Sequence, residues 1–169
     1  MTFQVGEKVV YPNHGVGTIE NISSRCFGAQ QERFYLLRLL PNSLTVMVPF
    51  SHVGDVGLRK VTKSSEINRV LAYFAAGRPT CAADWKDRFK ENSEKMANGS
   101  LLDIAEVFKA LCMLQMAKPL SFREKKMLER ARCMIVLETS IAKALSEIDA
   151  VTLITKYLAK SGLRMPSAL

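Results

Sequence analysis

Residues that bind metals or form familiar catalytic sites are scarce in this sequence of 169 residues. It has only two histidines, and its cysteines form no C-x-x-C pair and have no histidine at metal-ligand spacing. This excludes the common zinc motifs and predicts free thiols in a reduced protein without a bound metal. The four cysteines are Cys26, Cys81, Cys112 and Cys133.

Catalytic and nucleotide-binding motifs are also missing. No Walker loop, G-x-G-x-x-G, H-E-x-x-H or G-x-S-x-G pattern occurs. His14 stands in the turn-like PNHG and His52 follows VPFS, and neither has a partner at the spacing of a triad. We therefore expect both histidines to be structural or surface residues, and we expect a protein that is not an enzyme and needs no cofactor.

Long apolar runs are absent, and acidic residues are in the minority. The N-terminal MTFQVGEKVV lacks the basic start and apolar stretch of a signal peptide, which predicts a cytoplasmic protein with no membrane partner. Lys+Arg number 24 against 16 Asp+Glu, a net charge of +8. Residues 1–66 carry a net charge of +2, and residues 67–169 carry a net charge of +6. This asymmetry favours a polyanionic partner for the second part.

The first part of the chain has the pattern of short strands. Runs rich in Val, Ile, Tyr and Phe alternate with turn residues, and no apolar stripe with helical spacing lasts three turns. Four or five strands in so short a segment predict a small, strongly bent β-barrel over residues 1–60. Such modules bind a partner more often than they catalyse. The runs are KVVY, VGTIENI, RFYLLRLL and LTVMVPF.

Residues 61–169 have helical periodicity instead. Apolar residues recur at i, i+3, i+4 and i+7 in the first segment, and Ser121-x-x-Glu124 fits a capping box at the start of a long helix. The predicted fold class is therefore α+β, with a β-barrel followed by a compact all-α domain of about five helices. We expect residues 161–169 to be frayed. The predicted helices cover about 64–76, 84–96, a segment that follows Ser100 and ends before Pro119, 122–145 and 146–162.

A basic stripe follows Ser121 in the sequence. Arg123, Lys126 and Arg130 recur at i, i+3 and i+7, so they share one face of the predicted helix. Such a stripe can neutralise consecutive phosphates of a nucleic acid. It is equally compatible with a solvated face whose cations alternate with Glu124 and Glu129.

The only tryptophan, Trp85, allows two interpretations. A lone tryptophan in a small domain is most often a core anchor, because its large apolar surface dominates packing. Trp85, however, lies at the start of a predicted helix among charged residues, and Phe89 and Met96 already supply that helix with an apolar face. An exposed ring there could wedge against a base step while Lys86, Arg88 or Lys90 hold the phosphates.

Taken together, several long motifs resemble the CarD/CdnL family of bacterial RNA-polymerase-binding transcription regulators. The resemblance covers nearly the whole chain, in the order of the family, and is weaker beyond about residue 146. It implies a Tudor-like barrel over residues 1–60 and a helical DNA-binding domain over residues 61–169. The motifs are FQVGEKVVYPNHGVGTIENI, LTVMVP, VGLRK, DWKDRFKENSEKM and KPLSFREKKMLERARCMIVLE.

The resemblance also implies partners and site residues. The barrel is expected to bind the β subunit of RNA polymerase. The helical domain is expected to contact promoter DNA at the upstream edge of the transcription bubble, with Trp85 in the minor groove, and so support the open complex at housekeeping promoters. The expected polymerase contacts are Arg25, Val46, Met47 and Pro49. The expected DNA contacts are Trp85, Lys86, Arg88, Lys90, Arg123, Lys125, Lys126 and Arg130.

A second function class stays open from the sequence. The helical domain could dock another protein and make no contact with DNA, in which case the molecule is an adaptor on RNA polymerase and Trp85 is a core or interface anchor. A buried Trp85 would favour this alternative, and an exposed one would favour the wedge. In either case we expect a monomer.

Overall fold

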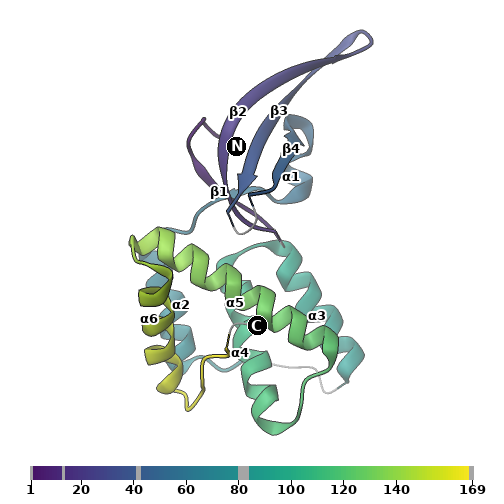
Figure 1. The fold of residues 1–169 in the computed structure, drawn as a ribbon. Coiled ribbons are helices and arrows are strands. Elements are labelled where there is room, and N and C mark those ends of the chain that lie inside the picture. The colour runs from purple at the N-terminus through teal and green to yellow at the C-terminus, as the bar shows by residue number, and fades with distance from the viewer. Residues whose placement is uncertain (1, 13, 41–42, 80–83, 168–169) are drawn as a thin grey trace. The chain divides into compact units, whose positions relative to one another are not determined.

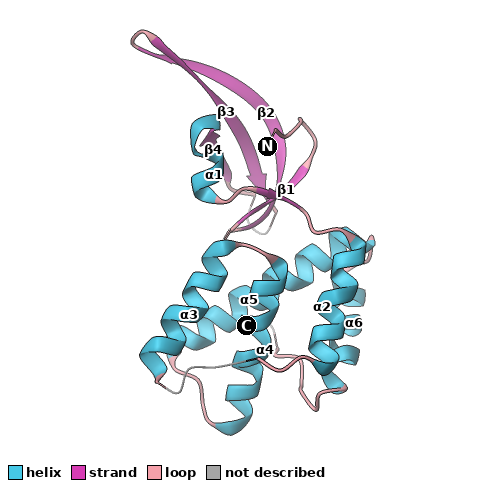
Figure 2. Cartoon of the chain, turned by 180° about the vertical axis from the view of Figure 1, so that it is seen from behind, coloured by secondary structure: helices cyan, strands magenta, loops and turns pink. Residues whose placement is uncertain are grey.

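The computed structural model describes residues 2–12, 14–40, 43–79 and 84–167. Of the cysteines, Cys81 lies outside the described residues. The chain divides into two compact units, Met1–Val61 and Thr62–Leu169, and each unit has its own class of secondary structure. The predicted α+β fold class, a small β module followed by a helical domain, is confirmed (Figures 1 and 2).

The first unit is a five-stranded antiparallel sheet with the order β4-β3-β2-β1-β5. Tyr35 on β3 is the centre of its core, at 2% exposure. Its ring stacks on Phe50 with centroids 4.1 Å apart, and its hydroxyl accepts a hydrogen bond from the Phe3 backbone at 3.1 Å. The elements are β1 Lys8–Tyr11, β2 Gly15–Phe27, β3 Gln30–Leu39, β4 Thr45–Pro49, the 3-10 turn η1 Phe50–His52, α1 Val53–Val56 and β5 Arg59–Lys60.

Strand β4 forms one edge of this sheet. It pairs with β3 on one side, and within the described residues no strand pairs with its other side. Its side chains alternate: Val48 is buried at 2% exposure, whereas Met47 is 38% exposed. An edge strand with free backbone groups and an exposed apolar side chain is able to accept a strand from another protein.

The second unit contains five helices in the described part of the chain (Figure 2). The apolar stripe predicted for the first of them is buried, from Ile67 at 0% to Phe74 at 0% exposure, and Phe74 packs against Phe108. The helical periodicity therefore identified the core correctly. The helices are α2 Ser64–Ala76, α3 Trp85–Asn98, α4 Leu101–Ala117, α5 Phe122–Lys143 and α6 Glu147–Ala159.

The segment after α6 differs from the prediction that it is frayed. Leu163 is 6% exposed, and its backbone N–H bonds to the carbonyl of Leu158 at 3.1 Å. Farther on, the Nε of Arg132 on α5 donates to the carbonyl of Pro166 at 2.8 Å. The prediction was wrong for residues 161–167 because a buried leucine and a side-chain donor hold this backbone in place.

A buried lysine ties three segments of the helical unit together. Lys109 on α4 is 1% exposed, and its Nζ donates to the carbonyls of Tyr73 and Gly77 and to the hydroxyl of Ser161. Burial lowers the pKa of Lys109 below its ordinary value. The ammonium group satisfies carbonyls at the C-terminal end of α2, where the helix dipole favours a cation.

We predict that Lys109→Met lowers the free energy of unfolding by about 2 kcal/mol, because the part-buried carbonyls of Tyr73 and Gly77 lose their bonds to the ammonium group. Urea unfolding followed by circular dichroism measures this. The control is Lys156→Met on the exposed face of α6, for which we expect a change within about 0.5 kcal/mol. Equal effects for the two variants would contradict the role given to Lys109.

Candidate nucleic-acid interface

Trp85 is the first residue of α3 and is 61% exposed. Asp84 caps the helix by accepting a hydrogen bond from the Lys86 backbone N–H at 3.4 Å, which fixes the backbone on both sides of the ring. The Lys86 ammonium lies 5.7 Å from the centre of the indole. The structure thus confirms the expected exposure of Trp85 at a helix start and excludes its placement in the core.

The buried face of α3 differs in composition from the one expected. Phe89 was expected to face the core, but it is only half-buried. The residues that face inward are Arg88, Asn92 and Met96, which are 5%, 6% and 3% exposed and recur at i, i+4 and i+8. A helix whose buried face begins with an arginine needs a carboxylate partner, and α5 supplies it.

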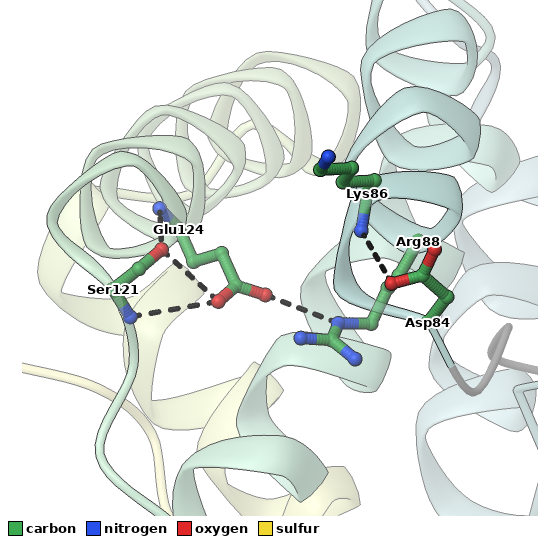
Figure 3. A network of polar contacts seen from close by, with 5 residues as sticks. All are labelled: Asp84, Lys86, Arg88, Ser121 and Glu124. Carbon is green, nitrogen blue, oxygen red and sulfur yellow. Dashed lines mark hydrogen bonds and ion pairs between the residues drawn. The ribbon is translucent and has the colours of Figure 1, made fainter.

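Arg88 forms a buried ion pair with Glu124. Its Nε donates to one carboxylate oxygen of Glu124 at 3.2 Å, and the two side chains are 6% and 10% exposed (Figure 3). The sequence placed Arg88 with Lys86 and Lys90 as a solvent-facing contact to phosphate. The structure differs on this point, because a side chain this buried, with a carboxylate partner, is not a free surface cation.

The same glutamate closes the capping box predicted from the sequence at the start of α5. The Ser121 hydroxyl accepts from the Glu124 backbone N–H at 3.2 Å, and the other oxygen of Glu124 accepts from the hydroxyl of Ser121 at 3.0 Å and from its N–H at 3.5 Å (Figure 3). The capping box is confirmed. One carboxylate therefore serves both the cap of α5 and the arginine of α3.

The remaining cations predicted to bind DNA lie at the surface. All six are exposed, and within the described residues none has a carboxylate partner. Two of the six, both on α5, lie beside aromatic rings: the guanidinium of Arg123 is 5.9 Å from the ring centre of Phe89, and the ammonium of Lys126 is 4.7 Å from that of Phe122. Unpaired cations beside exposed rings are typical of nucleic-acid surfaces. The six are Lys86, Lys90, Arg123, Lys125, Lys126 and Arg130.

One exposed aromatic residue in this region was not identified from the sequence. Phe122, the first residue of α5, is 72% exposed, and the Lys126 ammonium lies 4.7 Å from its ring centre. Phe122 and Trp85 both line a hollow of about 760 Å³ on the helical unit, together with Lys118. The signal was available, because Phe122 directly follows the cap at Ser121 and lies outside the apolar repeat of α5.

The residues predicted to contact the polymerase lie on two strands of the first unit. Met47 points outward from β4, whereas Val46 is half-buried and packs against the core of the sheet. Pro49 is half-buried at the end of β4 and pairs with Phe34. Arg25 is exposed on β2, two residues beyond the β2 partner of Phe34. Met47 and Arg25 are therefore the accessible members of this set.

Other kinds of site have little support in the described part of the chain. No group of three or more His, Cys, Asp or Glu residues there could hold a metal ion. Burial raises the pKa of the Cys112 thiol to about 12, whereas Cys26 and Cys133 are exposed free thiols. Among the helices that the structure describes, none has the length and apolar character to cross a membrane.

Comparison with known proteins gives matches over both units. The model of the CarD-like/TRCF RID domain matches residues 3–62, and that of the CarD C-terminal domain matches residues 69–155. YdeB of Bacillus subtilis (strain 168), named as a candidate transcription factor, is 32% identical over 145 residues, which cover 86% of this chain and 95% of that protein.

Two solved structures from Myxococcus xanthus are similar to about a third of the chain. CdnLNt is 41% identical and covers 36% of this chain and 86% of its own, with a TM-score of 0.32. The 72-residue N-terminal domain of CarD, solved by NMR, is 36% identical and covers 35% of this chain and 79% of its own, with a TM-score of 0.31. From the family models and the relative in Bacillus, the chain belongs to the CarD/CdnL family of transcription factors, which are not enzymes.

Proposed function

We propose that this protein binds the β subunit of RNA polymerase through its first unit and promoter DNA at the upstream edge of the transcription bubble through its helical unit. It thereby stabilises the open promoter complex at housekeeping promoters. The observation that carries the proposal is the exposed ring of Trp85 at a capped helix start, with exposed and unpaired cations on α3 and α5.

A wedge at the fork explains why binding would favour the open state. A ligand shifts an equilibrium only by its differential affinity for the two states. A ring that stacks at the edge of a melted region makes a contact that closed duplex DNA does not offer, and aromatic stacking contributes about 1–3 kcal/mol per base. The cations add affinity without sequence preference, because they contact phosphates.

The polymerase supplies the specificity in this account. A DNA contact made by one ring and a few lysines is weak alone, but tethering to the polymerase raises its local concentration at the promoter. The edge strand β4, with Met47 exposed on it, and the exposed Arg25 on β2 support the β subunit as the tether. The match to a CarD-like/TRCF RID domain supports the same partner.

We predict that Arg25→Glu weakens binding to the β subunit by about tenfold or more, because it reverses a charge on the proposed contact surface. Pull-down or calorimetric titration of the β subunit with the full chain measures the loss. Lys8→Glu is the matched control: Lys8 is exposed on β1 and pairs with Thr18, seven residues before Arg25 on β2, so its reversal should change affinity little. An Arg25 variant that binds like wild type would contradict the assigned surface.

We predict that Lys125→Gln lowers the affinity for forked DNA and reduces the slope of log K against log salt concentration by about 0.9, the effect of one lost phosphate contact. Fluorescence anisotropy of labelled forked DNA at several salt concentrations measures both quantities. Lys156→Gln on α6 is the control and should leave the slope unchanged. A slope that stays the same in the Lys125 variant would remove this residue from the phosphate contacts.

The adaptor alternative has one observation in its favour. Met113 and Met116 on α4 are 45% and 69% exposed beside a groove of about 670 Å³, which Arg78 and Leu163 also line. The described residues that line the groove include no carboxylate, so its fitting partner is an acidic amphipathic segment of another protein. The adaptor function is favoured if Met116→Glu abolishes open-complex stabilisation while Trp85→Ala does not.

A further inference from the structure

We propose that Arg88 and Glu124 are positioning residues that hold the wedge helix α3 in register with the basic start of α5. This inference rests on the proposed function, because it concerns how the two parts of the DNA surface are kept together. Neither residue needs to touch DNA. Their effect passes through Trp85, which lies one helical turn before Arg88.

The two halves of the proposed DNA surface come from helices that have little direct packing with each other. Both α3 and α5 pack on α4. Between α3 and α5 the described residues provide two side-chain ties, the ion pair of Arg88 with Glu124 and the approach of the Arg123 guanidinium to Phe89 at 5.9 Å. Only the ion pair is buried. The ion pair is therefore the buried polar tie that joins the two helix starts directly.

Glu124 is placed so that it fixes both helix starts at once. One of its oxygens is held by the Ser121 cap, and this fixes the carboxylate relative to the backbone that carries Phe122 and Lys126 (Figure 3). The other oxygen binds the Nε of Arg88 at 3.2 Å. Because the helix cap holds the carboxylate, the arginine has one preferred position, and α3 is fixed with it.

A buried ion pair is better suited to fixing geometry than to adding stability. Removing two charges from water costs about as much as their attraction returns, so neutral pairs of similar size often leave stability unchanged. An ion pair does, however, penalise every arrangement in which one charge is buried without the other. A rotation of α3 that moved Trp85 away from the cations of α5 would separate Arg88 from Glu124.

Glu124→Gln is the sharpest single test variant. Glutamine still fits the capping box at this position, so the change removes the ion pair and keeps the cap of α5. Glu106→Gln is the matched control: it removes the pair of Lys95 and Glu106, whose atoms lie 3.1 Å apart and which joins the other end of α3 to α4. Both variants lose one glutamate charge opposite a cation of α3.

The experiment is a double-mutant cycle with Trp85→Ala, and its readout is the lifetime of open complexes of RNA polymerase after a heparin challenge. We expect Glu124→Gln to shorten the lifetime about fivefold. When Glu124→Gln is already present, we expect Trp85→Ala to shorten the lifetime little further. Glu106→Gln should leave the full effect of Trp85→Ala in place. A purely structural role for the pair would give additive effects, because it does not act through the ring.

The outcomes separate this inference from the function on which it rests. If Trp85→Ala alone has no effect, the wedge function itself fails. Two other results overturn the positioning role and leave the wedge in place, provided that Trp85→Ala alone shortens the lifetime. In the first, Glu124→Gln has the lifetime of wild type. In the second, the effects of Glu124→Gln and Trp85→Ala on the lifetime are additive. If Glu124→Gln fails to fold, the cycle is repeated with Arg88→Met/Glu124→Gln, which leaves neither charge of the pair without its partner. We expect the same non-additive effect with Trp85→Ala.

Discussion

Replacing Trp85 by alanine shortens the lifetime of the open complex by about tenfold, the largest functional effect that we expect from one side chain. The ring is 61% exposed at the start of α3, so it contributes little to the core and its removal should leave the fold intact. Loss of one stacking contact costs about 1–3 kcal/mol, and 1.4 kcal/mol corresponds to tenfold. Dissociation of pre-formed open complexes after a heparin challenge measures this lifetime.

Trp85→Phe tests whether a smaller aromatic ring can replace the indole. Phenylalanine keeps an aromatic face that can stack on a base, so this variant should retain part of the lifetime that alanine loses. The thermal midpoint of both variants should stay within about 2 °C of wild type, because an exposed side chain contributes little to stability. If the lifetime does not change in the alanine variant, Trp85 is not a wedge.

Arg88→Ala lowers the free energy of unfolding of the helical unit by about 3–5 kcal/mol, the largest stability effect that we expect. The substitution leaves the Glu124 carboxylate 10% exposed and without its cation, and an uncompensated buried charge carries a penalty of this size. Denaturant unfolding followed by circular dichroism measures the change.

Two comparisons make the stability prediction specific. Arg88→Met/Glu124→Gln should recover most of the loss, because no buried charge is left unpaired. Lys95→Ala, which breaks a half-exposed pair at the other end of α3, should cost no more than about 1 kcal/mol. An Arg88→Ala variant that unfolds within about 0.5 kcal/mol of wild type would show that the ion pair is not buried in solution.

Patterns that depend on nearby residues could be predicted from the sequence. The helix starts at Phe122 because Ser121 and Glu124 form a capping box, and both residues lie within one turn of it. The buried stripe of α2 follows from its spacing. The exposure of Trp85 was predicted with the help of the family resemblance, since charged neighbours alone left a core position open. In each case the cause lies within a few residues of its effect.

Pairings between distant residues could not be predicted in the same way. Arg88 is separated by 36 residues from Glu124, and nothing in the local pattern distinguishes it from the exposed Lys86 and Lys90. Nothing in the sequence around Lys109 indicates that its ammonium group is bound by the carbonyls of Tyr73 and Gly77 at the C-terminal end of α2. In both cases the partner that makes burial of a charge tolerable comes from another helix.

The corrected position of Arg88 changes the mechanism in one respect. In the proposed mechanism, phosphate binding is left to exposed lysines and arginines, whose contribution weakens as salt rises. The proposed orientation of Trp85 depends instead on the buried pair of Arg88 and Glu124, which salt screens much less. We therefore expect added salt to weaken DNA affinity strongly. The factor by which Trp85→Ala shortens the open-complex lifetime should change little with salt.

We propose that this protein lengthens the life of the open complex through contacts at the edge of the bubble. The most direct measurement is the dissociation rate of open complexes on a ribosomal-type promoter, titrated with the wild-type protein. We expect the rate to fall and reach a plateau as the protein saturates the polymerase, and we expect the Trp85→Ala protein to have little effect at the same occupancy. A dissociation rate that does not change with saturating wild-type protein would contradict this proposal.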